Sequence, residues 1–219
     1  MSRTAVLFFH QSSEQDFRRR NGRFTPRQFR HLHRWQVKRT RTLLQELDVP
    51  VFDKFIQQGD TFGERLLSCL EQIRSQGYNR VLVVGRDCPT LQREDLTQAL
   101  RGLQQGKVYL GPDFRGGTYL MSFGLDTATL KGLSTIRWQT AHVLADLQQL
   151  FPDATLLNHR PDINELADVF TLKHTSAAHY WAILYLLRLL PSGAIKIAIS
   201  FVDPLARSRF YLRPPPIFS

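Results

Sequence analysis

Asp87 is the residue whose setting in the sequence best suits chemistry. It follows an unbroken apolar run, 81–84, whose β-branched side chains are typical of a strand buried on both faces. Gly85 ends the run, and Pro89 prevents the strand from continuing. Ligands of open α/β sheets bind outside the carboxyl ends of the strands, so Asp87 is placed to hold a metal ion or a ligand hydroxyl. The local residues leave open the alternative that Asp87 only caps the turn or the next helix.

The formal charge of the 219-residue chain is +10, and this excess points to an anionic partner. Nucleotides, sugar phosphates, nucleic acids and acidic membrane surfaces all meet that requirement. Between Arg18 and Arg41 there are ten basic residues and no acidic residue. We expect Arg20 and Arg23 to bind phosphate, because they lie in a loop between a strand and a helix N-terminus. We expect most arginines of that helix to form a solvated face.

Apolar runs and helical spacing predict that strands and helices alternate through residue 170. The expected strands are 4–10, 49–55, 81–84, 107–111, 117–123 and 154–158, and the expected helices are 26–47, 61–76, 93–104 and 139–150. Thr25 and Thr61 stand at N-cap positions, and residues 11–25 have the composition of a loop. The alternation implies an α/β fold with a mostly parallel, Rossmann-like sheet and helices on both faces.

Cysteine usage and the N-terminus indicate the cellular compartment. Cys69 falls in a helical pattern and Cys88 beside the end of a strand, so we expect neither a disulfide framework nor a cysteine zinc site. The N-terminus enters a strand-like run almost at once and lacks the layout of a signal peptide. Both features fit a reducing cytoplasm.

The composition changes from residue 176 onward. Residues 177–190 are strongly apolar, but the run is too short to span a bilayer. We expect a helix there that packs on the rest of the chain or forms a homodimer, with an interfacial helix as the lesser alternative. A further strand and a proline-rich tail follow. The expected organisation is therefore a domain of residues 1–175 and a C-terminal extension of residues 176–219.

Four segments, taken together, resemble a known family. The chain is similar to the GT-A superfamily of nucleotide-diphosphosugar transferases, and within it to the group called selenodomain-associated transferase 1. The matching segments are 58–66 (QGDTFGERL), 84–91 (VGRDCPTL), 111–120 (GPDFRGGTYL) and 162–168 (DINELAD), with a weaker match at Trp138 and Thr140. The resemblance covers roughly residues 4–170.

The resemblance implies a GT-A fold and roles for individual residues. Asp87 corresponds to the metal-binding aspartate of these enzymes, and Asp162 to a second carboxylate near the metal. Mg²⁺ or Mn²⁺ held there would bridge the diphosphate of a nucleotide sugar and stabilise the charge of the leaving group. Gly116 and Gly117 would let the backbone approach a ligand, although simple turn chemistry explains such a pair equally well.

Several positions depart from the family pattern. Arg86 replaces a serine, Phe114 and Arg115 replace an acidic pair, and Asn164 replaces an aspartate. Lost carboxylates weaken a metal site, while arginine can supply positive charge to a phosphate. We therefore expect an anion site with a weak or absent metal. Its members would be Arg20, Arg23, Arg86 and Arg115. The alternative is that these arginines pair with aspartates and hold loops together.

The function expected first is transfer of a glycosyl or nucleotidyl group, with a nucleotide sugar or another phosphorylated compound as substrate and a nucleotide sugar or nucleoside diphosphate as the expected partner. The second is a catalytically degenerate GT-A protein that binds a nucleotide or a protein partner. The third is nucleic-acid binding through residues 18–41, where basic residues alternate with aromatic ones (Phe17, Phe24, Phe29 and Trp35). No nucleic-acid-binding motif occurs in the sequence, so we do not expect nucleic acid to be the main partner.

Overall fold

The computed structural model describes residues 3–172 except for 20–23, 55–56, 166–167 and 169–171. Within these residues a six-stranded sheet has the strand order β2-β1-β3-β5-β4-β6. The strands are β1 (Thr4–Phe8), β2 (Val51–Phe52), β3 (Arg80–Val84), β4 (Tyr109–Pro112), β5 (Thr118–Gly124) and β6 (Thr155–Leu156). Among them, only β5 runs antiparallel to its neighbours. The prediction of a mostly parallel α/β sheet is confirmed.

The central strands β1 and β3 are apolar because helices cover both of their faces. They pair in parallel from Thr4 with Arg80 to Phe8 with Val84. Residues 81–84 are at most 4% exposed, as their unbroken apolar run predicts. This pairing places the carboxyl ends of both strands, and the loops that follow them, at one edge of the sheet.

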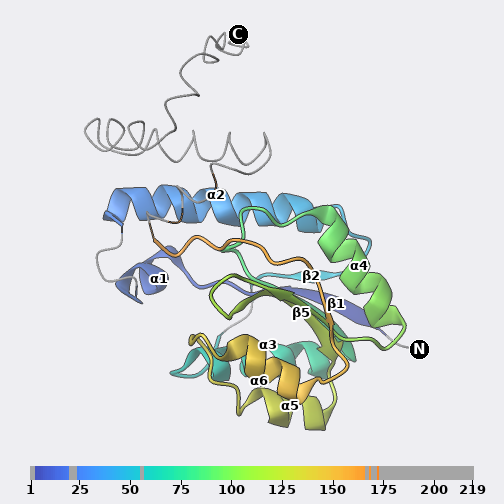
Figure 1. Ribbon diagram of the computed structural model, residues 1–219. Helices are drawn as coiled ribbons and strands as arrows, with labels where there is room; N and C mark the ends of the chain where they lie inside the picture. Colours follow the sequence, from blue (N-terminus) through green and yellow to red (C-terminus); the bar gives the residue numbers. More distant parts are fainter. Residues whose placement is uncertain (1–2, 20–23, 55–56, 166–167, 169–171, 173–219) are drawn as a thin grey trace.

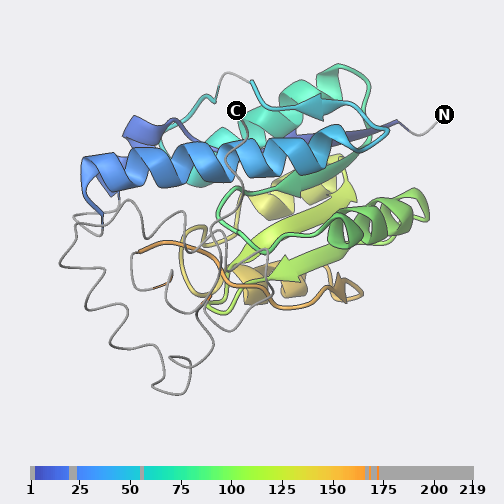
Figure 2. The same ribbon diagram turned by 90° about the horizontal axis from the view of Figure 1, so that it is seen from above.

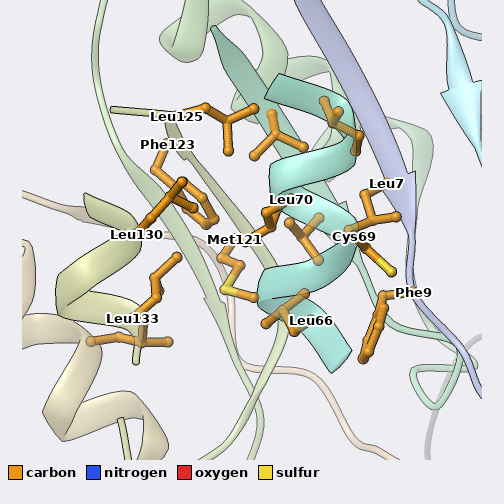
Figure 3. Packing of buried hydrophobic residues seen from close by; sticks show 14 of the residues in the cluster. Leu7, Phe9, Leu66, Cys69, Leu70, Met121, Phe123, Leu125, Leu130 and Leu133 are labelled. Carbon is orange, nitrogen blue, oxygen red and sulfur yellow. The ribbon is translucent and has the colours of Figure 1, made fainter. Parts of the chain in front are cut away.

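Helices lie on both faces of the sheet (Figure 1; Figure 2). One face is covered by α2 (Pro26–Gln45) and α4 (Arg93–Gln104), and the other by α3 (Phe62–Ser75), α5 (Thr127–Leu133) and α6 (Val143–Leu150). Figure 3 shows the hydrophobic core between the sheet and the helices α3, α5 and α6. In it, Leu66 and Leu70 of α3 pack beside Met121 and Phe123 of β5. The two cores share the sheet, so the strand ends are held from both sides.

The helix caps read from the sequence are present. The Thr25 side chain accepts a hydrogen bond from the Gln28 backbone, and the Gln28 side chain accepts one in return from the Thr25 N–H. Thr61 and Glu64 form the same reciprocal pair at the start of α3. These caps fix where α2 and α3 begin.

Three local predictions were wrong. Residues 13–19, expected to be loop, form α1 (Ser13–Arg19), whose sequence lacks helical apolar spacing because Phe17 is its single apolar residue. Residues 127–133 form α5, which had not been expected. The helix expected from residue 139 begins at Val143, because Gln139 has a positive φ of 65° that interrupts helical geometry.

The C-terminal predictions lie outside the described residues. Neither the boundary at 175/176 nor the expected C-terminal helix, strand and tail can be compared with the structure, and they stay predictions. Among the residues that are described, no helix has both the length and the apolar character needed to cross a membrane.

Candidate functional site

A cavity of about 690 Å³ opens at the carboxyl ends of β1 and β3. Its wall includes His10 after β1, residues 85–88 after β3, and Thr118 at the start of the antiparallel β5. The loop 138–141, Asp162 and Asn164 also line it. The residues after β1 and β3 are therefore positioned by the sheet, and the loops around them close the rest of the cavity wall.

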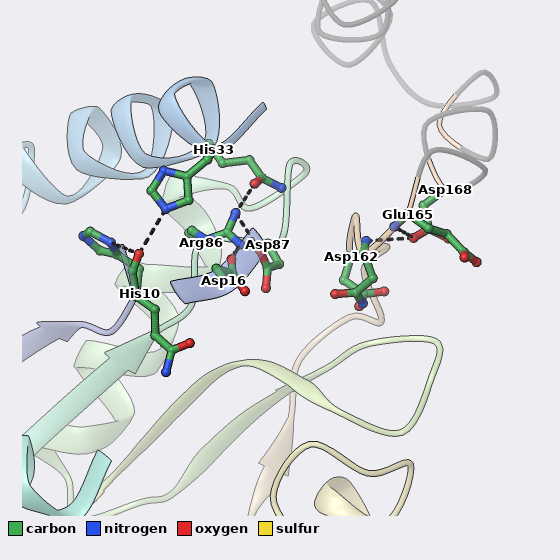
Figure 4. Close-up of polar contacts among 11 residues, drawn as sticks. His10, Asp16, His33, Arg86, Asp87, Asp162, Glu165 and Asp168 are labelled. Atoms are coloured by element: carbon green, nitrogen blue, oxygen red, sulfur yellow. Dashed lines mark hydrogen bonds and ion pairs between the residues drawn. The ribbon is translucent and has the colours of Figure 1, made fainter. Parts of the chain in front are cut away.

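Arg86 is buried in this wall and is surrounded by carboxylates. Its guanidinium pairs with Asp16 of α1 and with Oδ1 of Asp87, the latter at 3.0 Å. It also donates to the Gln36 side chain of α2 and lies 5.7 Å from the centre of the Phe29 ring. Figure 4 shows this group between α1, α2 and the end of β3. Burial lowers the pKa of Arg86 and the Asp87 charge opposes this, so the ion pairs balance a charge that water does not reach.

Arg115 is more exposed and holds a second group of acids. Its side chain lies 3.8 Å from Asp162 and 3.5 Å from Glu165, and it pairs directly with Asp168. Asp168 in turn accepts hydrogen bonds from the backbone N–H groups of Asn164 and Glu165. Arg115 therefore ties the turn after β4 to the segment that carries Asp162.

Asp162 is the carboxylate of the cavity wall whose pKa is clearly raised. Its side chain is 14% exposed, and burial raises its pKa to about 6. The charge of Asp113 raises the pKa further, Arg115 lowers it, and Asp87 adds a smaller raising effect. Asn164 donates a side-chain hydrogen bond to Asp162. This carboxylate consequently changes charge near neutral pH.

Asp87 and the segment bearing Asp162 are joined directly. The Ile163 N–H donates a 2.9 Å hydrogen bond to the Asp87 carbonyl, and Asp87 itself is 38% exposed. The structure thus brings the end of β3 against residues 162–164, and both aspartates line one cavity. Figure 4 shows their side chains on these two separate segments.

The glycine pair is required by its turn. Gly116 has a φ of +83°, and a Cβ there would lie 2.1 Å from the Ala141 carbonyl oxygen. A Cβ on Gly117 would lie 2.3 Å from the Asp113 carboxylate, whose other oxygen accepts the N–H groups of Arg115 and Gly117. Gly117 also lines the cavity. Turn geometry is sufficient to explain both residues, and a role for them in ligand binding stays a prediction.

The four arginines expected to form an anion site fall into two groups, those outside and those within the described residues. Arg20 and Arg23 lie outside the described residues, so their predicted phosphate contacts stay predictions. Arg86 and Arg115 line the cavity, as expected of site residues, but each is engaged by carboxylates. The pairing partners Asp162 and Asp87 were themselves expected in the site.

Sequence reasoning missed three cavity residues. Asp16 had no signal, because its importance comes from Arg86, seventy residues away in the chain. His10 ends the first expected strand and could have been found by the same strand-end argument as Asp87. Its pKa is lowered chiefly by burial, and its Nε2 has no hydrogen-bond partner among the described residues. Gln139 lines the cavity and has a left-handed backbone conformation. Neither property can be predicted from the sequence pattern around it.

Comparison with known proteins places this geometry in a family. The family of uncharacterized proteins conserved in bacteria (DUF2064) matches residues 29–140, just over half of the chain. None of the curated proteins matches the sequence. A crystal structure from Desulfovibrio desulfuricans G20, named as a candidate nucleotide-diphospho-sugar transferase, is similar at 22% identity and a TM-score of 0.70. That match covers 93% of this chain and 100% of the other.

A more distant similarity is to 4-diphosphocytidyl-2C-methyl-D-erythritol synthase from Anaerococcus prevotii DSM 20548, at 9% identity and a TM-score of 0.42, covering 83% of this chain and 96% of that one. The first similarity confirms the expected GT-A type of fold, since it extends over nearly the whole chain. With a family match over more than half of its residues, the chain belongs to the DUF2064 family and has the fold of the nucleotide-diphospho-sugar transferases.

Proposed function

We propose that this protein transfers a glycosyl or nucleotidyl group from a nucleotide sugar or a related nucleoside diphosphate compound. The observation that carries the proposal is the placement of Asp87 and Asp162 on one cavity at the carboxyl ends of β1 and β3. Ligands of α/β sheets bind at this edge, and a volume of about 690 Å³ lies within the range of small-molecule sites. The fold of the family adds support for this choice of substrate class.

The two aspartates fit a divalent cation. Asp162 is a buried carboxylate whose pKa is raised by burial and by the charges of Asp113 and Asp87, so a cation beside it would relieve an existing repulsion. Among the described residues no group of three or more acidic, histidine or cysteine side chains could hold a metal. Mg²⁺ is commonly bound by one or two carboxylates together with substrate phosphates, and this is the arrangement we propose for Mg²⁺ or Mn²⁺. The ion would supply positive charge to the departing diphosphate.

Asp162 has a second use in the proposed reaction. With a pKa of about 6 it is mostly ionised at neutral pH but can still take up a proton. In a site where Asp87 and the substrate phosphates hold the cation, Asp162 could therefore accept the proton of an attacking hydroxyl. Burial of the reacting groups in the cavity would strengthen both interactions.

The arginines are assigned a positioning role in this proposal. The ion pairs of Arg86 with Asp16 and Asp87 hold α1 against the end of β3, and those of Arg115 hold the Asp162 segment. Carboxylates already balance the charges of these two arginines. The ion pairs therefore favour a site in which a bound cation, rather than arginine alone, provides the affinity for phosphate. Arg115, whose side chain is 43% exposed, remains able to reach a phosphate.

Calorimetry with nucleoside diphosphates and nucleotide sugars tests the proposal, first in EDTA and then in excess Mn²⁺. We expect binding that needs Mn²⁺ and is lost in Asp87→Asn, which keeps the shape of the side chain but removes its charge. Asp153→Asn, on an exposed residue outside the cavity, is the matched control and should bind normally. Binding that is equally strong in EDTA, or that survives in Asp87→Asn, contradicts the assignment of the cation to these aspartates.

A non-catalytic binding protein is the second candidate, and the replacement of an acidic pair by Phe114 and Arg115 favours it. Phe114 is 69% exposed beside the cavity turn, where it stacks with His159 at 5.9 Å. The two candidates differ in turnover. If nucleotide sugars bind with Mn²⁺ but no nucleoside mono- or diphosphate is released in the presence of a range of hydroxyl acceptors, the binding protein is the better description.

A further inference from the structure

One part of the cavity wall is apolar and has no role in the proposed binding of phosphate. It contains Phe9 after β1, Phe62 at the start of α3, and Trp138 in the loop between α5 and α6. The Phe9 and Phe62 rings meet edge to face with their centres 5.2 Å apart, and the Phe62 and Trp138 rings are tilted with their centres 5.5 Å apart. Leu66 and Met121, which also line the cavity, belong to the core behind Phe9 (Figure 3). We refer to Phe9, Phe62 and Trp138 as the aromatic wall.

The Trp138 side chain is held in a fixed position. Its indole N–H donates a 3.1 Å hydrogen bond to the Leu133 carbonyl, so the single polar group of the ring is already used within the protein. The ring packs directly against Gly63 of α3, where a Cβ would lie 2.6 Å from Trp138 Cδ1. Arg137, the residue before it, is anchored to Asp146 of α6 by an ion pair. The indole is therefore a preformed apolar surface that offers a ligand no donor.

The polar groups of the loop that leads into α3 are also occupied. The Glu64 carboxylate accepts the N–H groups of Asp60 and Thr61, at 2.7 and 3.0 Å. The Arg65 side chain donates to the Asp60 carbonyl at 2.8 Å and to the carbonyl before it at 3.1 Å. The Thr61 hydroxyl accepts the Glu64 N–H. These backbone groups, which lie next to Phe62 in the chain, are thus satisfied before any ligand binds.

The chain after Trp138 has little more to offer a polar ligand. The Thr140 hydroxyl donates to the Arg137 carbonyl at 2.7 Å and accepts the His142 N–H at 3.1 Å. Gln139, which is exposed, adds one side-chain amide to this part of the cavity. A ligand on the aromatic wall consequently meets ring surfaces and few hydrogen-bonding groups.

This chemistry selects among the components of the proposed reaction. A sugar carries hydroxyl groups on most of its carbons, and a nucleobase has donors and acceptors along its edge. Placed against the aromatic wall, those groups would lose water without gaining partners, which is costly. An aromatic ring has no such groups to desolvate, and it packs well against other aromatic rings. The aromatic wall therefore suits an apolar ring better than it suits either part of a nucleotide sugar.

We propose that the aromatic wall binds the acceptor of the transfer reaction, and that this acceptor is a hydroxyl compound with an aromatic ring, such as a phenol or an aryl alcohol. The inference rests on the proposed function, because it assigns the second substrate of that site. The aromatic wall lines the same cavity as Asp87 and Asp162, so a compound bound there shares the cavity with the donor diphosphate.

The proposed transfer of a glycosyl group can be written with this acceptor. The hydroxyl oxygen of the acceptor forms a bond to the sugar carbon, and its proton passes to Asp162. The bond between that carbon and the diphosphate oxygen breaks, and the nucleoside diphosphate leaves with the electron pair.

Fluorescence polarisation of 4-methylumbelliferone, a fluorescent phenol with two fused rings, tests the proposal in the full chain. We expect binding in the presence of Mn²⁺ and a mixture of ADP, CDP, GDP and UDP. An excess of 2-phenylethanol should compete, whereas glycerol at the same concentration should not. Trp138→Leu should weaken binding about tenfold, because the ligand loses both the stacking and the apolar area of the indole.

Two further variants make the test specific. Gly63→Ala keeps the indole but displaces it, since the added methyl group meets Trp138, and it should weaken binding several-fold. Trp35→Leu is the matched control, because Trp35 packs against a different cluster and does not line the cavity, and it should bind as the wild type does. Thermal unfolding and Mn²⁺-dependent nucleotide binding by calorimetry show that each variant is folded and keeps its donor site.

Three results overturn the proposal: no binding of 4-methylumbelliferone to the wild type, equal binding to Trp138→Leu and Trp35→Leu, or displacement of 4-methylumbelliferone by the nucleotides, since an acceptor must bind beside the donor. If Trp138→Leu loses nucleotide binding instead, the wall holds the base and the acceptor assignment is wrong. In each of these cases, normal nucleotide binding by the wild type leaves the proposed function standing. If the wild type binds no nucleotide, the proposed function fails and the acceptor role fails with it.

Discussion

At the scale of single residues, the cavity holds groups that are costly to the folded protein. Asp162 is a carboxylate that burial and neighbouring acids disfavour in its charged form, and Gln139 has a backbone conformation that L residues rarely adopt. Such costs are tolerated where function needs them, and both lie on one cavity wall. Asp162 and Gln139 each lead to a prediction about stability that can be tested without knowing the substrate.

For Asp162, stability should depend on pH between about 4 and 6. The folded pKa of about 6 is higher than the unfolded value near 4, so the folded state binds the proton more tightly. This contribution to stability is fully present below pH 4 and is lost as pH rises to 6. Relative to wild type, Asp162→Asn should therefore gain about 2–3 kcal/mol between pH 4 and pH 7.5. Urea unfolding in EDTA measures the difference.

Asp153→Asn is the control for this comparison, because Asp153 is exposed and lies outside the cavity. Its difference from wild type should stay constant over the same pH range. If Asp162→Asn shows an equally constant difference, the Asp162 carboxyl is not perturbed and its proposed role as a proton acceptor loses support.

For Gln139, substitutions should rank by how well they tolerate a φ of 65°. Gln139→Gly removes a strain of about 1 kcal/mol but makes the unfolded chain more flexible, so its stability should equal or slightly exceed that of wild type. Gln139→Val places a β-branched side chain in the same conformation and should lose about 1–2 kcal/mol. Equal unfolding midpoints for the glycine and valine variants would show that the left-handed backbone is absent in solution.

At the scale of elements, the sequence predicts those strands, helices and caps that are determined by local patterns of apolar and capping residues. The strand β3, the helix α4 and the caps of α2 and α3 are where apolar spacing and cap residues place them. α1 escapes such reasoning because long-range contacts hold it: Asp16 pairs with Arg86, and Phe17 packs on Phe29 at 5.6 Å. No local pattern encodes a contact between residues seventy positions apart. The cavity position of Asp87 and the pairing of Arg86 with a nearby aspartate could be expected from the sequence, whereas the pairing of Arg86 with Asp16 could not.

The Arg86 ion pairs should therefore determine how firmly α1 is attached. Arg86→Met leaves Asp16 and Asp87 without their buried partner, and we expect a loss of about 3–5 kcal/mol in the free energy of unfolding. Arg93→Met is the matched control, because Arg93 is 59% exposed and lies 3.8 Å from Glu46. Such a surface pair is worth no more than about 1 kcal/mol. A similar small loss in both variants would mean that water reaches Arg86 and that α1 is held mainly by Phe17.

At the scale of the whole molecule, the described residues form a sheet with a core on each face and a cavity at one edge. Every residue that lines the cavity precedes residue 165. The small cluster of Phe24, Phe29, Leu32, Ile163 and Leu172 closes the end of α2. The described residues of 3–172 thus contain the whole cavity wall, and the expected packing of residues 176–219 on this domain or on a second copy of the chain stays a prediction.

This division predicts that the proposed transferase site functions without the C-terminal extension. A chain shortened to end at Thr175 should keep cooperative unfolding and Mn²⁺-dependent nucleotide binding, because Leu172 and the cavity wall are retained. Light scattering of the full and shortened chains shows whether the extension drives self-association. If the shortened chain unfolds without a cooperative transition, residues 176–219 are part of the core, and the boundary after residue 175 is wrong.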